Sequence, residues 1–140
     1  MDGVLITVGI IANPAAGKDI RRLVAAGRVV SNQEKANTLR RVFAGLVSTG
    51  VERVIVMPDL SRLAAPAMED VQEHIDASYL EMPRIDHQDG STRAAKLMAA
   101  EGAGAIVTLG GDGTNRVVAK GAGDVPLVPI STGTNNVFPQ

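Results

Sequence analysis

The sequence predicts an α/β fold with three layers, in which a parallel sheet carries helices on both faces. Short apolar runs rich in β-branched residues alternate along the chain with stretches whose apolar residues recur at helical spacing. Most connections between them are short and contain glycine, proline, asparagine or aspartate. With 140 residues and a mass of 14.5 kDa, the chain has the size of one domain, so we expect a single α/β domain over residues 1–140.

The composition excludes several classes of function. The formal net charge is -1 and the aromatic content is 2%, so there is neither a basic stripe nor a stacking platform for nucleic acid. The absence of cysteine excludes disulfides, thiolate zinc sites and cysteine nucleophiles, and it suits a cytoplasmic protein. The longest apolar run, residues 4–12, is far shorter than the roughly 20 residues that span a membrane, and no basic segment precedes it as in a signal peptide.

The first half of the chain begins with a predicted strand at residues 4–12, which leads into the loop Asn13-Pro14-Ala15-Ala16-Gly17-Lys18. This loop is not a P-loop, because Ala12 stands where a glycine belongs and Asp19 where a serine or threonine belongs. Residues 19–30 fit either a short helix or a loop. A capping-box pattern starting at Ser31, followed by an apolar stripe and Gly50, predicts a helix over 31–50. The next predicted elements are a strand at 54–57, a helix at 63–75 and a strand at 78–82.

The second half continues the alternation. A polar loop at 86–90 precedes a helix at 91–101 that Gly102 ends. The two histidines, His74 and His87, are far from each other and from any acidic cluster, so we place both at the surface and not in a metal site. The last predicted elements are a strand at 105–109, a helix at 115–120 ended by Gly121, and a strand at 127–130.

The stretch Gly110-Gly111-Asp112-Gly113-Thr114 lies between a buried strand and a helix. Glycines let the backbone turn sharply and approach a ligand, and the amides at the start of the helix can then bind an anion. The Asp112 carboxylate could bind Mg²⁺ or take a proton from an attacking hydroxyl, as in phosphoryl transfer. The simpler alternative is an aspartate that only caps the following helix.

Two more loops have the same position relative to a strand. Asn13 to Lys18, Gly110 to Thr114 and Ser131 to Asn136 each follow a predicted strand. Because the carboxyl ends of parallel strands share one edge of the sheet, we expect the three loops to converge on one ligand there. Loop amides and threonine hydroxyls suit phosphate oxygens, and Asn135 and Asn136 suit a ribose or base, although all of these residues are also ordinary turn and cap formers.

Together the motifs carry a family resemblance. Gly110-Gly111-Asp112-Gly113-Thr114 resembles the signature shared by the NAD kinases and the diacylglycerol and sphingosine kinases. Asn13-Pro14-Ala15-Ala16-Gly17-Lys18 and the segment from Pro129 to Phe138 resemble the first and third nucleotide-site segments of that superfamily, in the same order. Within it, the chain looks most like the predicted ATP-NAD kinases related to the acetoin-catabolism protein X group.

The resemblance implies a phosphofructokinase-like N-terminal domain, ATP or polyphosphate as phosphoryl donor, Mg²⁺, and NAD as the leading acceptor. It gives Asp112 the role of catalytic base or metal-side residue. It also implies a second, β-rich C-terminal domain, so we expect the chain to be the N-terminal part of a longer two-domain kinase and a weak enzyme by itself. The nucleotide-binding residues that the motifs predict are Asn13, Pro14, Gly17, Lys18, Gly110, Gly111, Gly113, Thr114, Arg116, Gly133, Thr134, Asn135 and Asn136.

One departure leaves the acceptor open. NAD kinases carry an asparagine and then an acidic residue in the third segment, whereas here Asn135 is followed by Asn136, which is closer to the lipid-kinase pattern. The alternatives to an NAD kinase are therefore a diacylglycerol-type lipid kinase and a nucleotide-binding module without catalysis. No basic amphipathic helix is evident for a membrane surface. The sequence leaves the oligomeric state open, a homo-oligomer included.

Overall fold

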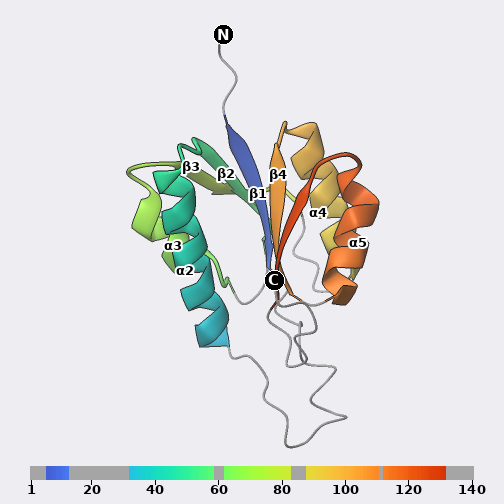
Figure 1. Cartoon of the computed structure of the whole chain (residues 1–140), viewed down its shortest axis with the longest axis horizontal. Coiled ribbons are helices and arrows are strands. Elements are labelled where there is room, and N and C mark those ends of the chain that lie inside the picture. The colour runs from blue at the N-terminus through green and yellow to red at the C-terminus, as the bar shows by residue number, and fades with distance from the viewer. Residues whose placement is uncertain (1–5, 13–31, 59–61, 83–87, 111, 132–140) are drawn as a thin grey trace, which may run out of the picture.

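The protein forms a five-stranded, fully parallel sheet in the order β3-β2-β1-β4-β5, with helices on both faces. The computed structural model describes residues 6–12, 32–58, 62–82, 88–110 and 112–131. Figure 1 shows α2 and α3 covering one face and α4 and α5 covering the other. The three-layer α/β prediction is therefore confirmed. The described elements are β1 (Thr7–Ala12), α2 (Asn32–Ser48), β2 (Arg53–Val56), α3 (Ala65–Val71), β3 (Asp76–Tyr79), α4 (Gln88–Ala100), β4 (Ala105–Gly110), α5 (Asp112–Ala122) and β5 (Leu127–Ser131).

Alternate residues of the central strands point to opposite faces and divide the core in two. On the α2/α3 face, Ile10 of β1 and Val54 of β2 pack with Leu39 and Phe43 of α2, and all four side chains are 0% exposed. On the α4/α5 face, Ile11 of β1 packs with a layer of smaller residues from α4 and α5 that includes Ala94, Ala95, Val118 and Ala122. The sheet is thus covered by bulky side chains on one face and by mostly small ones on the other.

The long helix predicted at 31–50 is confirmed as α2, and Gly50, with a φ of 90°, follows it as the sequence indicates. α3 is shorter than the predicted 63–75, although every residue of the predicted stripe, from Leu63 to Ile75, is buried. Pro66 stands in its first turn, where the missing amide hydrogen costs nothing. The predicted hydrophobic stripe is therefore confirmed, but it extends beyond the helix into the turns on either side.

Three other boundaries predicted from the sequence are wrong. β3 runs over 76–79 and not 78–82, because its position is set by pairing Asp76–Tyr79 with Arg53–Val56 of β2. α4 begins at Gln88, so residues 88–90 of the predicted polar loop are helical. α5 begins at Asp112 and not at Asn115.

α5 also continues through Gly121, where the sequence predicted its end. A Cβ added at Gly121 would lie 2.2 Å from the backbone oxygen of Thr92 in α4, so this glycine permits the close approach of two helices. The left-handed residue that follows the helix is Gly123, with a φ of 62°. The sequence could not distinguish a glycine that ends a helix from one that lets a neighbouring helix approach.

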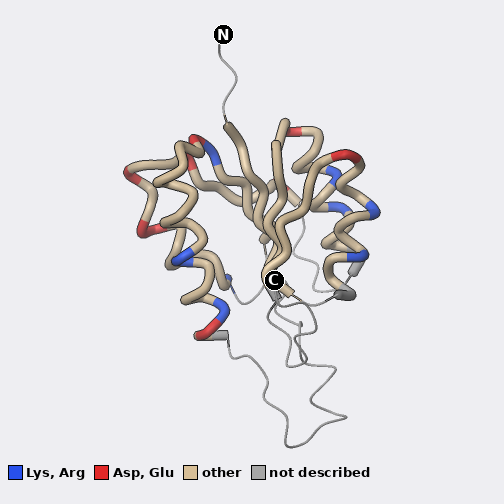
Figure 2. The backbone as a smooth tube through the Cα atoms, in the orientation of Figure 1, with Lys and Arg blue, Asp and Glu red and all other residues tan. Residues whose placement is uncertain are grey.

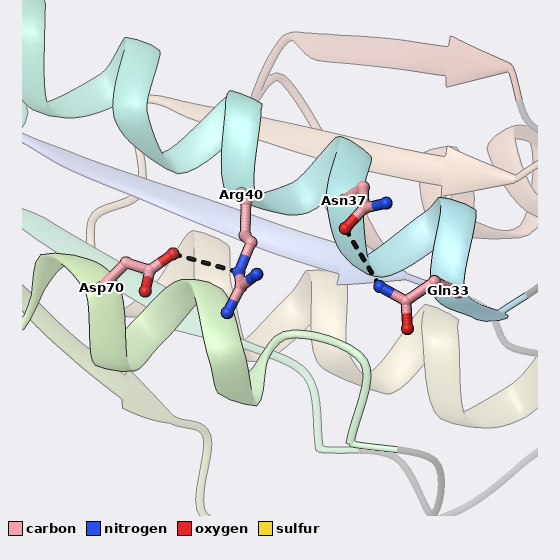
Figure 3. Close-up of polar contacts among 4 residues, drawn as sticks. All are labelled: Gln33, Asn37, Arg40 and Asp70. Atoms are coloured by element: carbon pink, nitrogen blue, oxygen red, sulfur yellow. Dashed lines mark hydrogen bonds and ion pairs between the residues drawn. The ribbon is translucent and has the colours of Figure 1, made fainter.

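On the opposite face of the sheet, an exposed ion pair joins α2 and α3. Arg40 of α2 and Asp70 of α3 form an ion pair of 3.1 Å, and both side chains are about half exposed (Figure 3). Within α2, the Gln33 side-chain amide donates to Asn37 one turn later (Figure 3). These contacts are exposed to solvent, so the burial of Leu39 and Phe43 contributes far more to holding α2 in place.

Candidate functional site

The ends of the three strands that precede the predicted loops lie side by side. Ala12 of β1 pairs with Leu109 of β4, and Leu109 pairs in turn with Ile130 of β5. Neighbouring strands are about 4.8 Å apart, so the ends of β1 and β5 are separated by roughly 10 Å. The structure therefore confirms that the three loops start from one edge of the sheet and from adjacent positions along it.

This edge includes the position at which the strand order reverses. From β1 the chain continues to β2 on one side, and it returns through α4 to β4 on the other side of β1. In open α/β sheets, ligands bind outside the carboxyl ends of the strands at this reversal. The three strands concerned, β1, β4 and β5, contain no charged residue. Figure 2 shows the charges on the helices and at the ends of the connections.

The turn from β4 into α5 is built around Gly110. A Cβ added there would lie 2.6 Å from the hydroxyl oxygen of Thr114 and 2.8 Å from its Cβ. Thr114 is 6% exposed, so its side chain fills the space that a side chain at position 110 would need. Only glycine fits at the end of this strand, and its absence of a side chain brings the first turn of α5 close to the sheet.

A second contact holds the same turn, and it involves Thr108, the strand residue two positions before Gly110. The Thr108 hydroxyl donates a hydrogen bond to the side-chain oxygen of Asn115. Thr108 is 0% exposed, and a buried hydroxyl without a partner would cost about 1–3 kcal/mol. Thr108 and Gly110 lie on the α4/α5 face of β4, and they contact two successive residues of α5.

The first turn of α5 has the features of an anion site. The first four amides of a helix lack partners within the helix, and the helix dipole favours negative charge at this end. The helix has 11 residues and begins at Asp112, two residues after Gly110, the buried last residue of β4. A phosphate group fits this arrangement. The backbones of Asp112 and Gly113 belong to the helix, and the Asp112 side chain lies outside the described part of the structure.

Several predicted binding residues fall on parts of the chain that the structure does not describe. Arg116 of α5 is described, and its side chain is exposed to solvent. Thr114 and Gly110 are placed as above. The predicted residues that lie outside the described ranges are Asn13, Pro14, Gly17, Lys18, Gly111, Gly133, Thr134, Asn135 and Asn136.

Three polar residues of this region are not predicted by the sequence motifs. By pattern alone, Thr108 is an ordinary strand residue and Asn115 an ordinary helix residue, although a threonine in an apolar strand just before a glycine loop can indicate a contact with that loop. Lys35, in the first turn of α2, is 2% exposed. It stands four residues before Leu39 and eight before Phe43, on the stripe that faces the sheet. Figure 1 shows α2 beginning at the end of the molecule where the strands finish.

Two observations concern other classes of site. In the part of the chain that the structure describes, no three His, Cys, Asp or Glu residues gather in a way that could hold a metal ion. Mg²⁺ needs only one or two protein carboxylates beside phosphate oxygens and water, so such a cluster is not required for it. Across the same residues, no helix has both the length and the apolar character needed to cross a membrane. His74 is exposed, as predicted, and His87 lies outside the described residues.

Comparison with solved structures supports the fold. A crystal structure of POFUT1 in complex with GDP superposes with a TM-score of 0.52 and 16% sequence identity, covering 89% of this chain and 41% of that one. At this level of identity the likeness concerns the arrangement of strands and helices only.

Comparison with known sequences is more specific. The acetoin catabolism protein X of Cupriavidus necator (strain ATCC 17699) is 42% identical over 140 residues. The alignment covers 95% of this chain but 39% of that protein, so the chain spans about two fifths of the length of its curated relative. The family model described as ATP-NAD kinase N-terminal domain matches residues 8–139, which include the β1, β4 and β5 ends and all three loops. The chain therefore belongs to the ATP-NAD kinase N-terminal domain family.

Proposed function

We propose that this chain is the nucleotide-binding part of a kinase that transfers a phosphoryl group from ATP to a hydroxyl group, with NAD as the leading acceptor. One observation carries the proposal. The family match includes the turn between β4 and α5, in which a strand ending in Gly110 leads directly into a helix that starts with Asp112. This turn lies at the reversal of strand order, where α/β sheets bind ligands.

The proposed reaction assigns a role to each group predicted at this edge. The amides at the start of α5 would hold phosphate oxygens of the donor. Asp112 would take the proton of the acceptor hydroxyl as its oxygen bonds to the terminal phosphorus, while the bond to the leaving diphosphate breaks. Bound Mg²⁺ would supply charge neutralisation between the phosphates. Catalysis of this type depends on positioning and electrostatics, so the precise placement of the α5 turn matters.

The length of the relative supports a two-part protein. Because the chain corresponds to 39% of the acetoin catabolism protein X, we propose that a further domain closes the site and completes the acceptor pocket. We expect residues 1–140 alone to bind nucleotide weakly and to turn over poorly. Robust phosphoryl transfer by purified residues 1–140 would contradict this part of the proposal.

The decisive experiment replaces the proposed base. In the full-length protein, Asp112→Asn should lower kcat by about 10²- to 10⁴-fold while nucleotide binding persists, because the amide cannot accept the proton. The matched control is Asp124→Asn, which changes an exposed aspartate that follows the other end of the same helix and should leave kcat unchanged. Equal kcat values for wild type and Asp112→Asn would overturn the assignment of Asp112.

The alternative acceptor to NAD is a lipid hydroxyl. A diacylglycerol-type acceptor is favoured by one feature, the pair Asn135-Asn136 in place of asparagine and an acidic residue. A panel of thermal shifts with ATP, polyphosphate, NAD, NADP and a short-chain diacylglycerol would separate the alternatives, since stabilisation follows occupancy. The largest shift with NAD supports the leading acceptor, and the largest shift with the diacylglycerol supports the lipid kinase.

A second alternative is a binding module without catalysis. It predicts stabilisation by ATP or NAD together with no transfer of labelled phosphate to any acceptor by the full-length wild type. In that case Asp112→Asn would change neither property.

A further inference from the structure

We infer that Thr108 and Asn115 form a positioning pair, which fixes the first turn of α5 relative to β4 and so sets where Asp112 stands. The inference deepens the proposed function and rests on it. Neither residue would touch the substrate. Their role would be to hold the backbone that carries the base and the phosphate-binding amides.

Burying a hydroxyl at Thr108 has a free-energy cost that an apolar residue would avoid. β4 is otherwise made of alanine, isoleucine, valine, leucine and glycine, and Thr108 at 0% exposure lies among fully buried neighbours. A valine of the same shape would fill the space without a polar group that needs a partner. The hydrogen bond to Asn115 offsets the cost of burying the Thr108 hydroxyl, so this bond accounts for a threonine at a buried position.

The hydrogen bond between Thr108 and Asn115 joins the strand before the glycine-rich turn to the helix after it. Asn115 is the fourth residue of α5, so the bond links β4 and α5 across the glycine-rich turn that connects them. A second contact between the same two elements lies closer to the turn, where Thr114 packs against Gly110. Two successive helical residues are thus fastened to two positions on one face of the same strand. The first turn of α5 cannot rotate or shift along the strand without losing both contacts.

A comparison within α5 shows that this fastening is local. Two residues after Asn115, the Thr92 hydroxyl of α4 donates a 2.8 Å hydrogen bond to the backbone oxygen of Val117. That bond also secures α5, but it holds the helix to α4 and not to the strand that carries the glycine turn. Thr92→Val is therefore a matched control, because it removes a threonine hydroxyl bonded to the same helix.

The kinetic experiment compares the two variants in the full-length protein. Thr108→Val should lower kcat about tenfold or more, since a displacement of about 1 Å at a reacting group can cost 10²-fold in rate. Thr92→Val should change kcat less than about twofold, and Thr108→Ser, which keeps the hydroxyl, should restore most of the loss. KM for ATP should change less than kcat in Thr108→Val, because under the proposed function the other two loops would hold the donor as well.

A double-mutant cycle tests the pairing itself. If the hydroxyl acts through Asn115, then Asn115→Ala should lower kcat by a similar factor, and the double variant should be no worse than either single one. Multiplicative losses would show that the two residues act separately and would overturn the pair.

Hydrogen exchange tests the inference without any substrate. The amides of Arg116, Val117 and Val118 bond back to the first turn of an α-helix, so their exchange reports opening of that turn. Thr108→Val should speed their exchange several-fold more than global stability accounts for, and Thr92→Val should not. Equal exchange and equal kcat in the two variants would overturn the inference. A full-length wild type that transfers no phosphate would overturn the proposed function instead, while the exchange result would still decide whether the pair holds the turn.

Discussion

The two faces of the sheet are packed in different ways. On the α2/α3 face, large side chains such as Leu39, Phe43 and Leu63 fill the space between helix and sheet. On the α4/α5 face, helices approach each other through Gly121, Thr92 and Ala95, and Met98 lies against Gly9 of β1. Bulky aliphatic contacts provide burial and tolerate some rearrangement. Close contacts between backbones fix a distance, and this second face is the one that carries the turn at Gly110.

The comparison suggests a division of roles. The α2/α3 face would supply most of the stability, and the α4/α5 face would supply the geometry of the proposed site. Changes on the first face should therefore alter the free energy of unfolding more than the catalytic rate of the protein that remains folded. Changes on the second face that displace the turn at Gly110 should alter both.

The largest effect on stability is expected at Phe43. Phe43→Ala removes a ring that is 0% exposed and leaves a cavity against β1 and β2, which should cost about 3–5 kcal/mol in the free energy of unfolding. Urea denaturation of wild type and variant measures this loss. At urea concentrations below the unfolding transition, ligand should still stabilise the Phe43→Ala variant. Complete loss of this stabilisation in the folded variant would contradict the division of roles.

A smaller effect on the free energy of unfolding is expected at Gly121, where it tests the contact between α4 and α5. In Gly121→Ala the new methyl group would meet the backbone oxygen of Thr92, so α4 and α5 must separate, at a cost of about 1–3 kcal/mol. Gly45→Ala in α2 is the matched control, since no atom lies within 4 Å of the added Cβ. That control should stabilise the protein by about 0.5–1 kcal/mol through helix propensity. Equal changes in unfolding midpoint for the two variants would show that the helices are not in tight contact.

The smallest effect is expected at the exposed ion pair. Asp70→Asn breaks the contact with Arg40 between α2 and α3, and both side chains are about half exposed. The change in the free energy of unfolding should be below about 1 kcal/mol and should shrink as salt is added. Unfolding curves at low and high ionic strength measure it. A loss comparable to that of Phe43→Ala would mean that surface electrostatics, and not burial, holds this pair of helices.

Much of the site could be predicted from the sequence, for a topological reason. The motifs at Asn13, Gly110 and Ser131 each follow a short apolar run, and parallel strands necessarily bring their carboxyl ends to one edge. The family resemblance is confirmed by the match over residues 8–139 and by the 42% identical relative. The assignments of individual binding residues stay predictions.

The sequence by itself therefore determined the class of fold, the order of its elements and the strand ends that share the carboxyl edge. These follow from local periodicity and glycine placement, which each segment carries within itself. Only the tertiary structure decided where β3 pairs, that Gly121 serves helix contact and not helix termination, and that Thr108 bonds to Asn115. Such features depend on which surfaces meet across the fold. A single segment does not contain that information, because a glycine or a buried hydroxyl takes its role from the neighbour that packs against it.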